Sequence, residues 1–130
     1  MARKYRVMII GGVLYPLHLA ISRDWKVHYF TADMAANATH RAEEQRFLAD
    51  MPGVIGSRAV AALESIGKTM GLDYAGVDFG VADGALLLFE ANATMVINPP
   101  DPDPMWDYRR APILAALDAA KRLVLAKAKR

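Results

Sequence analysis

Residues 75–92 of the chain read AGVDFGVADGALLLFEAN. Residues 75–81 and 85–91 are mostly apolar, and each segment has the length of an ordinary strand. Between them stand Ala82, Asp83 and Gly84, a sequence that favours a compact hairpin loop. The stretch therefore predicts two neighbouring antiparallel strands.

Side chains alternate across a strand, so the predicted hairpin has an odd-numbered and an even-numbered face. The even-numbered face carries Asp78, Glu90 and Asn92. With an odd number of loop residues, Asp78 should lie opposite Leu88 and diagonal to Glu90, about 7 to 8 Å away. The odd-numbered residues are all apolar, and we expect helices to bury Ala75, Val77, Phe79, Val81, Ala85, Leu87, Phe89 and Ala91.

The N-terminal part of the chain predicts further strands. Residues 5–10 are rich in β-branched side chains and end at Gly11-Gly12, and residues 13–22 and 25–31 continue the pattern. Pro16 should lie at a sheet edge or a bulge, because proline cannot donate a ladder hydrogen bond. Three short strands in succession predict an antiparallel meander.

Helical spacing follows from residue 37 to residue 51, where one apolar stripe faces a polar face that includes His40 and Glu44. Pro52-Gly53 should end this helix, and Ser57 is a suitable N-cap for a helix that closes at Gly71. After a proline-rich loop at residues 98–104, residues 109–129 predict a final amphipathic helix. The expected fold is one α+β domain over residues 1–130, with a largely antiparallel sheet and helices packed on one face.

Composition excludes several functional classes. The 130 residues contain 54% hydrophobic and 23% charged side chains, which is typical of a packed domain. The net charge is only +2, and the basic residues cluster at the termini as solvated ends, so we expect no nucleic-acid partner. Without cysteine there is no disulfide framework and no thiolate nucleophile. No apolar run is long enough to cross a membrane, and we expect a cytoplasmic protein.

The even-numbered face of the hairpin is the candidate functional site. Asp78, Glu90 and Asn92 offer the hard oxygen ligands that Mg²⁺ prefers. Because Mg²⁺ usually takes one or two carboxylates from protein and its other ligands from phosphate and water, this pattern predicts a nucleotide site with Mg or Mn. The alternative is an acidic, exposed sheet face that binds nothing.

The order of motifs resembles the C-terminal part of the ATP-grasp superfamily. The resemblance runs from about Tyr5 to Asn92 and rests on a strand arginine, a Gly-Gly turn, two helices, Gly76-Val-Asp78-Phe and Phe-Glu90-Ala-Asn92. The superfamily contains ATP-dependent carboxylate-amine and carboxylate-thiol ligases, among them glutathione synthetases and ribosomal-protein glutamate ligases. The resemblance implies an ATP- and Mg-binding lobe that activates a carboxylate as an acyl phosphate for attack by an amine.

The resemblance also implies residue roles. Asp78 is similar to the aspartate that holds one Mg²⁺, Glu90 to the glutamate that bridges two, and Asn92 to the asparagine on the second. Arg6 resembles the catalytic strand arginine that faces phosphate or the acyl phosphate. For the small carboxylate substrate, His28 and Arg23 are candidates, with a structural histidine and a solvated arginine as the alternatives; Arg109 and Arg110 are weighed in the same way.

The chain departs from the superfamily in one respect. Complete ATP-grasp enzymes sandwich ATP between two α+β lobes, and the N-terminal nucleotide lobe has no counterpart here. We therefore expect weak nucleotide binding and little or no turnover by this chain alone. The alternatives are a non-catalytic lobe that binds metal or self-associates, for instance as a homodimer, and a stable remnant without activity.

Overall fold

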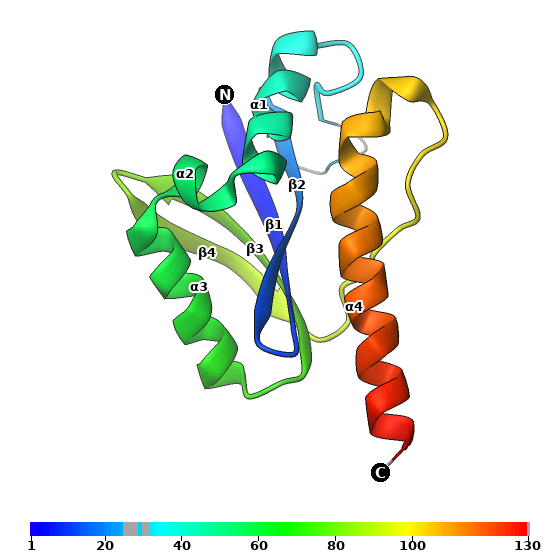
Figure 1. Ribbon diagram of the computed structural model, residues 1–130. Coiled ribbons are helices and arrows are strands. Elements are labelled where there is room, and N and C mark those ends of the chain that lie inside the picture. Colours follow the sequence, from blue (N-terminus) through cyan, green and yellow to red (C-terminus); the bar gives the residue numbers. More distant parts are fainter. Residues whose placement is uncertain (25–28, 30–31, 130) are drawn as a thin grey trace.

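The computed structural model describes residues 1–24, 29 and 32–129. The strands and helices follow the order ββαααββ and then a 3-10 helix and a final α-helix (Figure 1). Their bounds are β1 Ala2–Ile10, β2 Val13–Ser22, α1 Ala38–Ala49, α2 Met51–Ile55, α3 Ser57–Met70, β3 Tyr74–Ala82, β4 Ala85–Asn92, η2 Pro104–Arg109 and α4 Arg110–Ala128.

The strands form one four-stranded antiparallel sheet in the order β2-β1-β3-β4, which confirms the predicted α+β class. The first two strands of the predicted meander are confirmed as an antiparallel pair, β1 with β2, and β1 also pairs with β3 on its other side. The third strand expected at residues 25–31 falls largely outside the described residues. Pro16 lies on the edge strand β2 opposite Val7, beside a shift in register, as expected for a residue without a backbone donor.

The β3–β4 hairpin differs from the prediction in its register. Its loop holds two residues, Asp83 and Gly84, both with positive φ (51° and 77°), as a tight hairpin turn requires. A bulge between Asp78 and Phe79 then shifts the pairing, so Asp78 lies directly opposite Glu90 and Leu88 lies opposite Phe79. The two carboxylates are thus direct neighbours rather than diagonal ones.

The bulge also corrects the expected burial of β4. Leu87, Leu88 and Phe89 are 50%, 53% and 56% exposed, so the odd-numbered positions of this strand are not uniformly buried. The physical reason is twofold: the extra residue interrupts the alternation of side chains, and β4 is an edge strand without a neighbour in the described sheet.

One face of the sheet, here called the three-helix face, packs against α1, α2 and α3. Gly71 ends α3 with φ 62°, as predicted from the sequence, and Asn37 caps α1 by accepting a hydrogen bond from the His40 amide. The predicted N-cap at Ser57 is wrong, because Gly56 precedes the helix and no side chain among the described residues caps it. The predicted helix end at Pro52-Gly53 is also wrong, because both residues lie within α2, where a proline in the first turn costs no helical hydrogen bond. The fully buried side chains of this core include Val7, Leu19, Phe47, Leu63, Val77 and Phe79. This face is the main hydrophobic core of the domain.

The opposite face, here called the α4 face, has a covered half and an open half. In the covered half, Met8, Ile10 and Leu17 pack against α4 and the segment that precedes it. Helices therefore lie on both faces of the sheet (Figure 1), which corrects the expectation of helices on one face. The reason is that these sheet residues are apolar and require a second layer.

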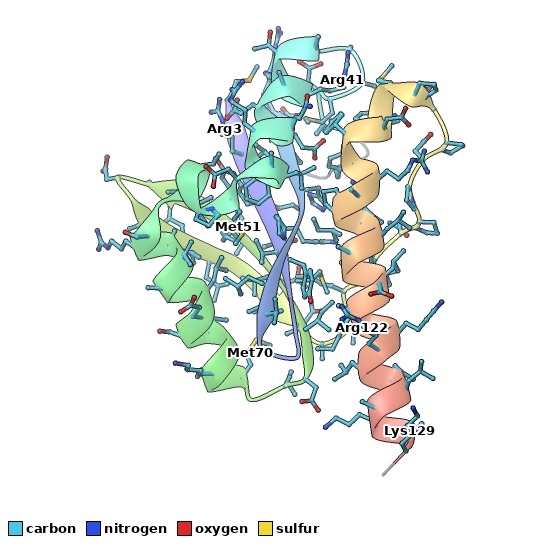
Figure 2. The ribbon with its side chains drawn as sticks, viewed as in Figure 1. Arg3, Arg41, Met51, Met70, Arg122 and Lys129 are labelled. Carbon is cyan, nitrogen blue, oxygen red and sulfur yellow. The ribbon has the colours of Figure 1, made fainter. Side chains whose placement is uncertain are left out.

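Side chains fill the space between α4 and the strands, whereas Arg122 and Lys129 lie on the outside of the C-terminal helix (Figure 2). Their exposure agrees with the interpretation of the basic C-terminus as a solvated end. Among the described residues, no helix has the length and apolarity needed to cross a membrane.

Candidate functional site

The open half of the α4 face carries a row of four polar side chains, one from each strand. His18 lies opposite Arg6, Arg6 opposite Asp78, and Asp78 opposite Glu90. Because directly opposite residues of antiparallel strands project to the same side, all four belong to one face. We call His18, Arg6, Asp78 and Glu90 the charged row.

Asp78 is the buried centre of this row. The Arg6 guanidinium donates to both of its carboxylate oxygens, from Nε at 2.7 Å and from Nη2 at 2.9 Å. Lys4 Nζ lies 3.6 Å from Asp78 Oδ2, and Asp78 is only 2% exposed. The hydrogen bond to Asp78 is the main cause that raises the pKa of Arg6. A bidentate pair of this kind fixes the position of both side chains.

Glu90 and Asn92 lie at the exposed side of the row, on β4. The Asn92 amide nitrogen donates to Glu90 Oε1 at 2.7 Å, and its amide oxygen accepts from the Thr94 backbone amide at 2.9 Å. The structure thus brings Asp78, Glu90 and Asn92 to one face, since Asn92 lies two residues beyond Glu90 and opposite Gly76.

Asp78 and Glu90 supply two carboxylates on adjacent strands, the number that Mg²⁺ commonly takes from protein. Adjacent carboxylates repel each other, and a divalent cation relieves that repulsion. Mg²⁺ takes one or two carboxylates and completes its octahedron with phosphate and water. Within the described part of the chain, no cluster of three or more acidic, histidine or cysteine residues is suited to a metal ion. Asp78 and Glu90 are the residues that would hold an ion here, but both Asp78 oxygens already accept from Arg6 and Asp78 is 2% exposed, so Glu90 offers the accessible carboxylate.

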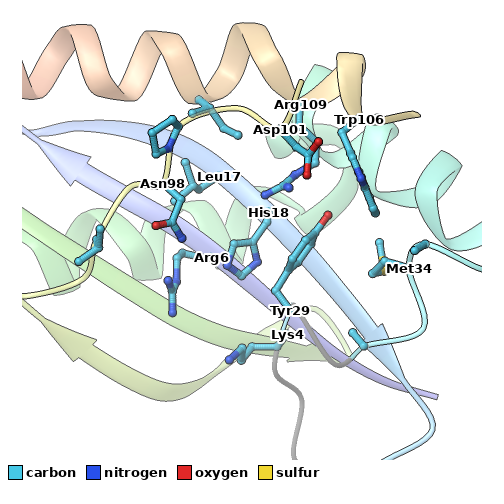
Figure 3. A pocket seen from close by; sticks show the side chains of 15 residues that line it. Lys4, Arg6, Leu17, His18, Tyr29, Met34, Asn98, Asp101, Trp106 and Arg109 are labelled. Carbon is cyan, nitrogen blue, oxygen red and sulfur yellow. The ribbon is translucent and has the colours of Figure 1, made fainter. Parts of the chain in front are cut away.

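A pocket of about 400 Å³ adjoins the row (Figure 3). Strands β1 and β2 supply Arg6 and His18, and Tyr29 and Trp106 supply aromatic rings to its wall. Polar groups at the remaining sides come from Lys4, Asn98, Asp101 and Arg109, and apolar ones from Leu17, Ala32, Met34, Ala35, Val96, Pro99 and Ile113. The pocket therefore combines cations with aromatic and aliphatic surface.

The pKa of His18 reflects its burial and the positive charges around the pocket. Burial lowers the pKa of His18 well below 6.5, and the positive charges of Arg6, Arg109 and Lys4 lower it further. Its Nδ1 atom is buried without a hydrogen-bond partner among the described residues. His18 is therefore a neutral imidazole in a positively charged environment.

Behind the pocket wall lies Glu44, a residue that sequence analysis placed on the polar face of its helix and that is 0% exposed. It accepts from the Leu19 backbone amide at 2.9 Å, from Tyr29 Oη at 3.0 Å and from Tyr108 Oη. Burial raises the pKa of Glu44, opposed first by the charge of Arg109. The available signal was its spacing, three residues before Phe47, which places Glu44 on the buried side of α1.

Arg109 joins this buried network to the pocket. Its Nε atom lies 3.7 Å from Glu44 Oε1, and its guanidinium carbon lies 4.2 Å from the centre of the Tyr29 ring and 5.8 Å from that of Trp106. The alternative interpretation of Arg109 as a solvated surface arginine is thus wrong, because its side chain is 14% exposed. That interpretation holds for Arg110, which is paired with Asp107 at 3.3 Å in an exposed position.

The structure places one of the two residues predicted to contact the carboxylate substrate. Arg23 is exposed and does not line the pocket, because it follows the end of β2. His28 lies outside the described residues.

Comparison of the chain with protein-family models, with curated proteins and with solved structures found no match.

Proposed function

We propose that this chain is the Mg²⁺- and ATP-binding lobe of an ATP-dependent carboxylate-amine ligase. The observation that supports the proposal most directly is the charged row, in which Arg6, Asp78 and Glu90 meet on three adjacent strands. Two adjacent carboxylates and a guanidinium are the groups required to hold a metal-bound polyphosphate. The resemblance to the ATP-grasp superfamily adds the reaction class.

The proposed chemistry follows from these groups. A carboxylate oxygen of the substrate attacks the terminal phosphorus of ATP and ADP leaves; an amine then attacks the acyl carbon and phosphate leaves. Bound Mg²⁺ would neutralise charge on the phosphate oxygens. Asp78 and Glu90 would hold it, and Arg6 would face the transferred phosphoryl group. The bidentate contact with Asp78 orients Arg6 in advance of binding.

Binding should be weak and turnover small. The row lies on the open half of one sheet face, so one lobe supplies only part of the contacts that a sandwiched nucleotide would need. Incubation with ATP, Mg²⁺ and pooled amino acids should release little ADP, and vigorous ADP release would contradict the expected lack of turnover.

The experiment for the site is Mn²⁺ binding by electron paramagnetic resonance, with and without ATP. Glu90→Gln should lower Mn²⁺ affinity at least about tenfold, because one of two charged ligands is lost. Since Glu90 is exposed, the variant should remain folded. Glu64→Gln, an equally exposed change on α3, is the matched control. Equal Mn²⁺ binding by the wild type and Glu90→Gln would exclude the proposed metal site.

A specific observation favours a second candidate function, a self-associating lobe. Leu87, Leu88 and Phe89 form an exposed apolar run on the edge strand β4. An edge strand has backbone groups free to pair with a second copy. Sedimentation analysis should then show a dimer that Leu88→Lys dissociates; a monomer at all concentrations would exclude this candidate.

A further inference from the structure

We propose that the pocket beside the charged row binds a small aromatic monocarboxylate, with the carboxylate at Arg109, the ring against Tyr29 and Trp106, and Lys4 contributing its charge from the opposite side of the pocket (Figure 3). This inference goes beyond the proposed metal and nucleotide site, because it needs neither Asp78 nor Glu90 as a ligand. It rests on the pocket's cations, its aromatic wall and its volume of about 400 Å³.

The charges of the pocket fit an anion. Three cations, Lys4, Arg6 and Arg109, line it against one carboxylate, Asp101. All three cations act on the buried His18, which stays neutral and adds no charge of its own. Asp78 is the counter-charge of Arg6 and Lys4, and Glu44 faces Arg109 from behind the wall, so an anion would be attracted by the donor groups that face the cavity rather than by an excess of positive charge. In a partly desolvated site such charge interactions are stronger than in water.

The three cations differ in availability. Arg6 already donates two hydrogen bonds to Asp78. Arg109 is held from one side only: its Nε faces Glu44 Oε1 at 3.7 Å, and its terminal nitrogens make no hydrogen bond to a described residue. Lys4 is 3.6 Å from Asp78 Oδ2. One guanidinium with two open N–H groups matches one carboxylate, which favours a monoanion.

The wall of the pocket fits a flat apolar body. The rings of Tyr29 and Trp106 lie 6.2 Å apart, tilted by 58°, and the guanidinium of Arg109 lies over the Tyr29 ring. Aliphatic side chains of Leu17, Met34 and Ile113 complete the surface. An aromatic ring gains from contact with such rings and from removal of apolar area from water.

Hydrogen bonds and an ion pair position the pocket wall. Glu44 accepts hydrogen bonds from Tyr29 and from Tyr108, and it faces Arg109. These contacts join α1, η2 and the segment that contains Tyr29. Because the ring and the guanidinium are already fixed, little ordering entropy opposes binding.

The test uses the full chain, without ATP or divalent cations, and four probes. These are benzoate, benzamide as its neutral isostere, acetate as a carboxylate without a ring, and phenyl phosphate. The chain has two tryptophans, so Trp25→Phe leaves Trp106 as the single fluorescent reporter. We expect saturable binding of benzoate with a Kd of about 1 mM or tighter, and at least about tenfold weaker binding of benzamide and acetate.

Two variants and one control assign the anion contact. Arg109→Met should weaken benzoate binding at least about tenfold, and Lys4→Met about threefold. Arg122→Met removes an arginine from the outside of α4, where its side chain is 66% exposed, and should change nothing (Figure 2). If Arg109→Met fails to fold because Glu44 loses its counter-charge, the benzoate affinity of Lys4→Met and the relative affinities of benzoate and benzamide still decide whether the pocket binds a carboxylate.

Three outcomes would overturn the inference. These are no saturable benzoate binding up to about 10 mM, equal affinity for benzoate and benzamide, or unchanged benzoate affinity in both Lys4→Met and Arg109→Met. Tighter binding of phenyl phosphate than of benzoate would also overturn it and assign a phosphate site instead. Failure of the Mn²⁺ experiment with Glu90→Gln would remove the metal site alone, so the two proposals are distinguishable.

Discussion

The three-helix face and the open half of the α4 face are built from the same strands, yet they differ in almost every property. On β3, Val77 and Phe79 are 0% exposed among apolar side chains, whereas Asp78 between them is 2% exposed among charges. Strand alternation allows one backbone to serve both faces. The core therefore specifies where the backbone lies, and the opposite face uses this fixed backbone to hold charges together.

The largest expected effect lies in the core. Phe79→Ala should lower the free energy of unfolding by about 3 to 5 kcal/mol, because it removes a fully buried ring that stacks on Tyr5. Leu88→Ala, at the directly opposite position of β4, should lower it by less than about 1 kcal/mol, because Leu88 is 53% exposed. Urea unfolding measures both values. Similar losses at the two positions would contradict the division between core and edge.

The next effect lies within the charged row. Asp78→Asn should lower the free energy of unfolding by about 2 to 4 kcal/mol, because it leaves Arg6 and Lys4 without their shared counter-charge in a mostly buried site. Glu90→Gln, the opposite position on β4, should stay within about 0.5 kcal/mol of the wild type. Thermal unfolding of the two variants side by side would measure this, and equal stability would mean that Asp78 is not the structural centre of the row.

Two glycines of β3 lie on the α4 face, Gly76 against Met95 in the covered half and Gly80 against Phe89 in the open half. A Cβ at Gly76 would overlap Met95, at 2.7 Å from its Cβ, whereas a Cβ at Gly80 would meet only the end of the exposed Phe89 ring at 2.9 Å. Gly76→Ala should therefore lower the free energy of unfolding by about 1 to 3 kcal/mol, and Gly80→Ala by less than about 1 kcal/mol. A reversed order in urea unfolding would show that the open half is the tighter one.

The smallest effect is a dependence on pH. The pKa of His18 is lowered well below 6.5 in the folded protein, so below pH 6.5 the unfolded chain binds a proton that the folded chain does not. Stability should therefore fall by up to about 1.4 kcal/mol per pH unit as the pH falls below 6.5, and be fully present above it. The groups that face His18 are Arg6, Arg109, Lys4 and the Tyr29 ring.

His18→Leu isolates this effect from Glu44. Because the pKa of Glu44 is raised above 4.5, Glu44 acts in the opposite sense and lowers stability as the pH rises through that raised value. The difference in free energy of unfolding between the wild type and His18→Leu removes this shared contribution. A difference that does not change between pH 7.5 and pH 5.5 would contradict a neutral, buried His18.

Much of the charged row followed from local chemistry. Alternation places Glu90 and Asn92 on one face in any regular strand, and the hairpin brings Asp78 beside them. The register did not follow, because a bulge depends on how the β4 side chains pack and not on the loop residues alone. Arg6 was identified through resemblance, and only the pairing of β1 with β3 placed it on Asp78.

The pocket could be predicted from the sequence to a much smaller extent. The spacing of Glu44 from Phe47 places it on the buried side of α1, but its charged and polar neighbours Arg41, Glu43 and Gln45 gave no reason to expect a buried carboxylate. Its burial arises because Tyr29, Tyr108 and Arg109, from distant parts of the chain, converge on it. Contacts between segments so far apart in sequence leave no periodic signal.

Local sequence was sufficient for the α+β class, the end of α3 at Gly71 and the shared side of Glu90 and Asn92, because propensity, capping and alternation act over a few neighbouring residues. Only the tertiary structure decided that α4 covers the second face, that Asp78 lies directly opposite Glu90, and that Arg109 lies beside Tyr29. Each of these depends on long-range packing, where the free energy of burial selects among arrangements that local rules leave equally possible.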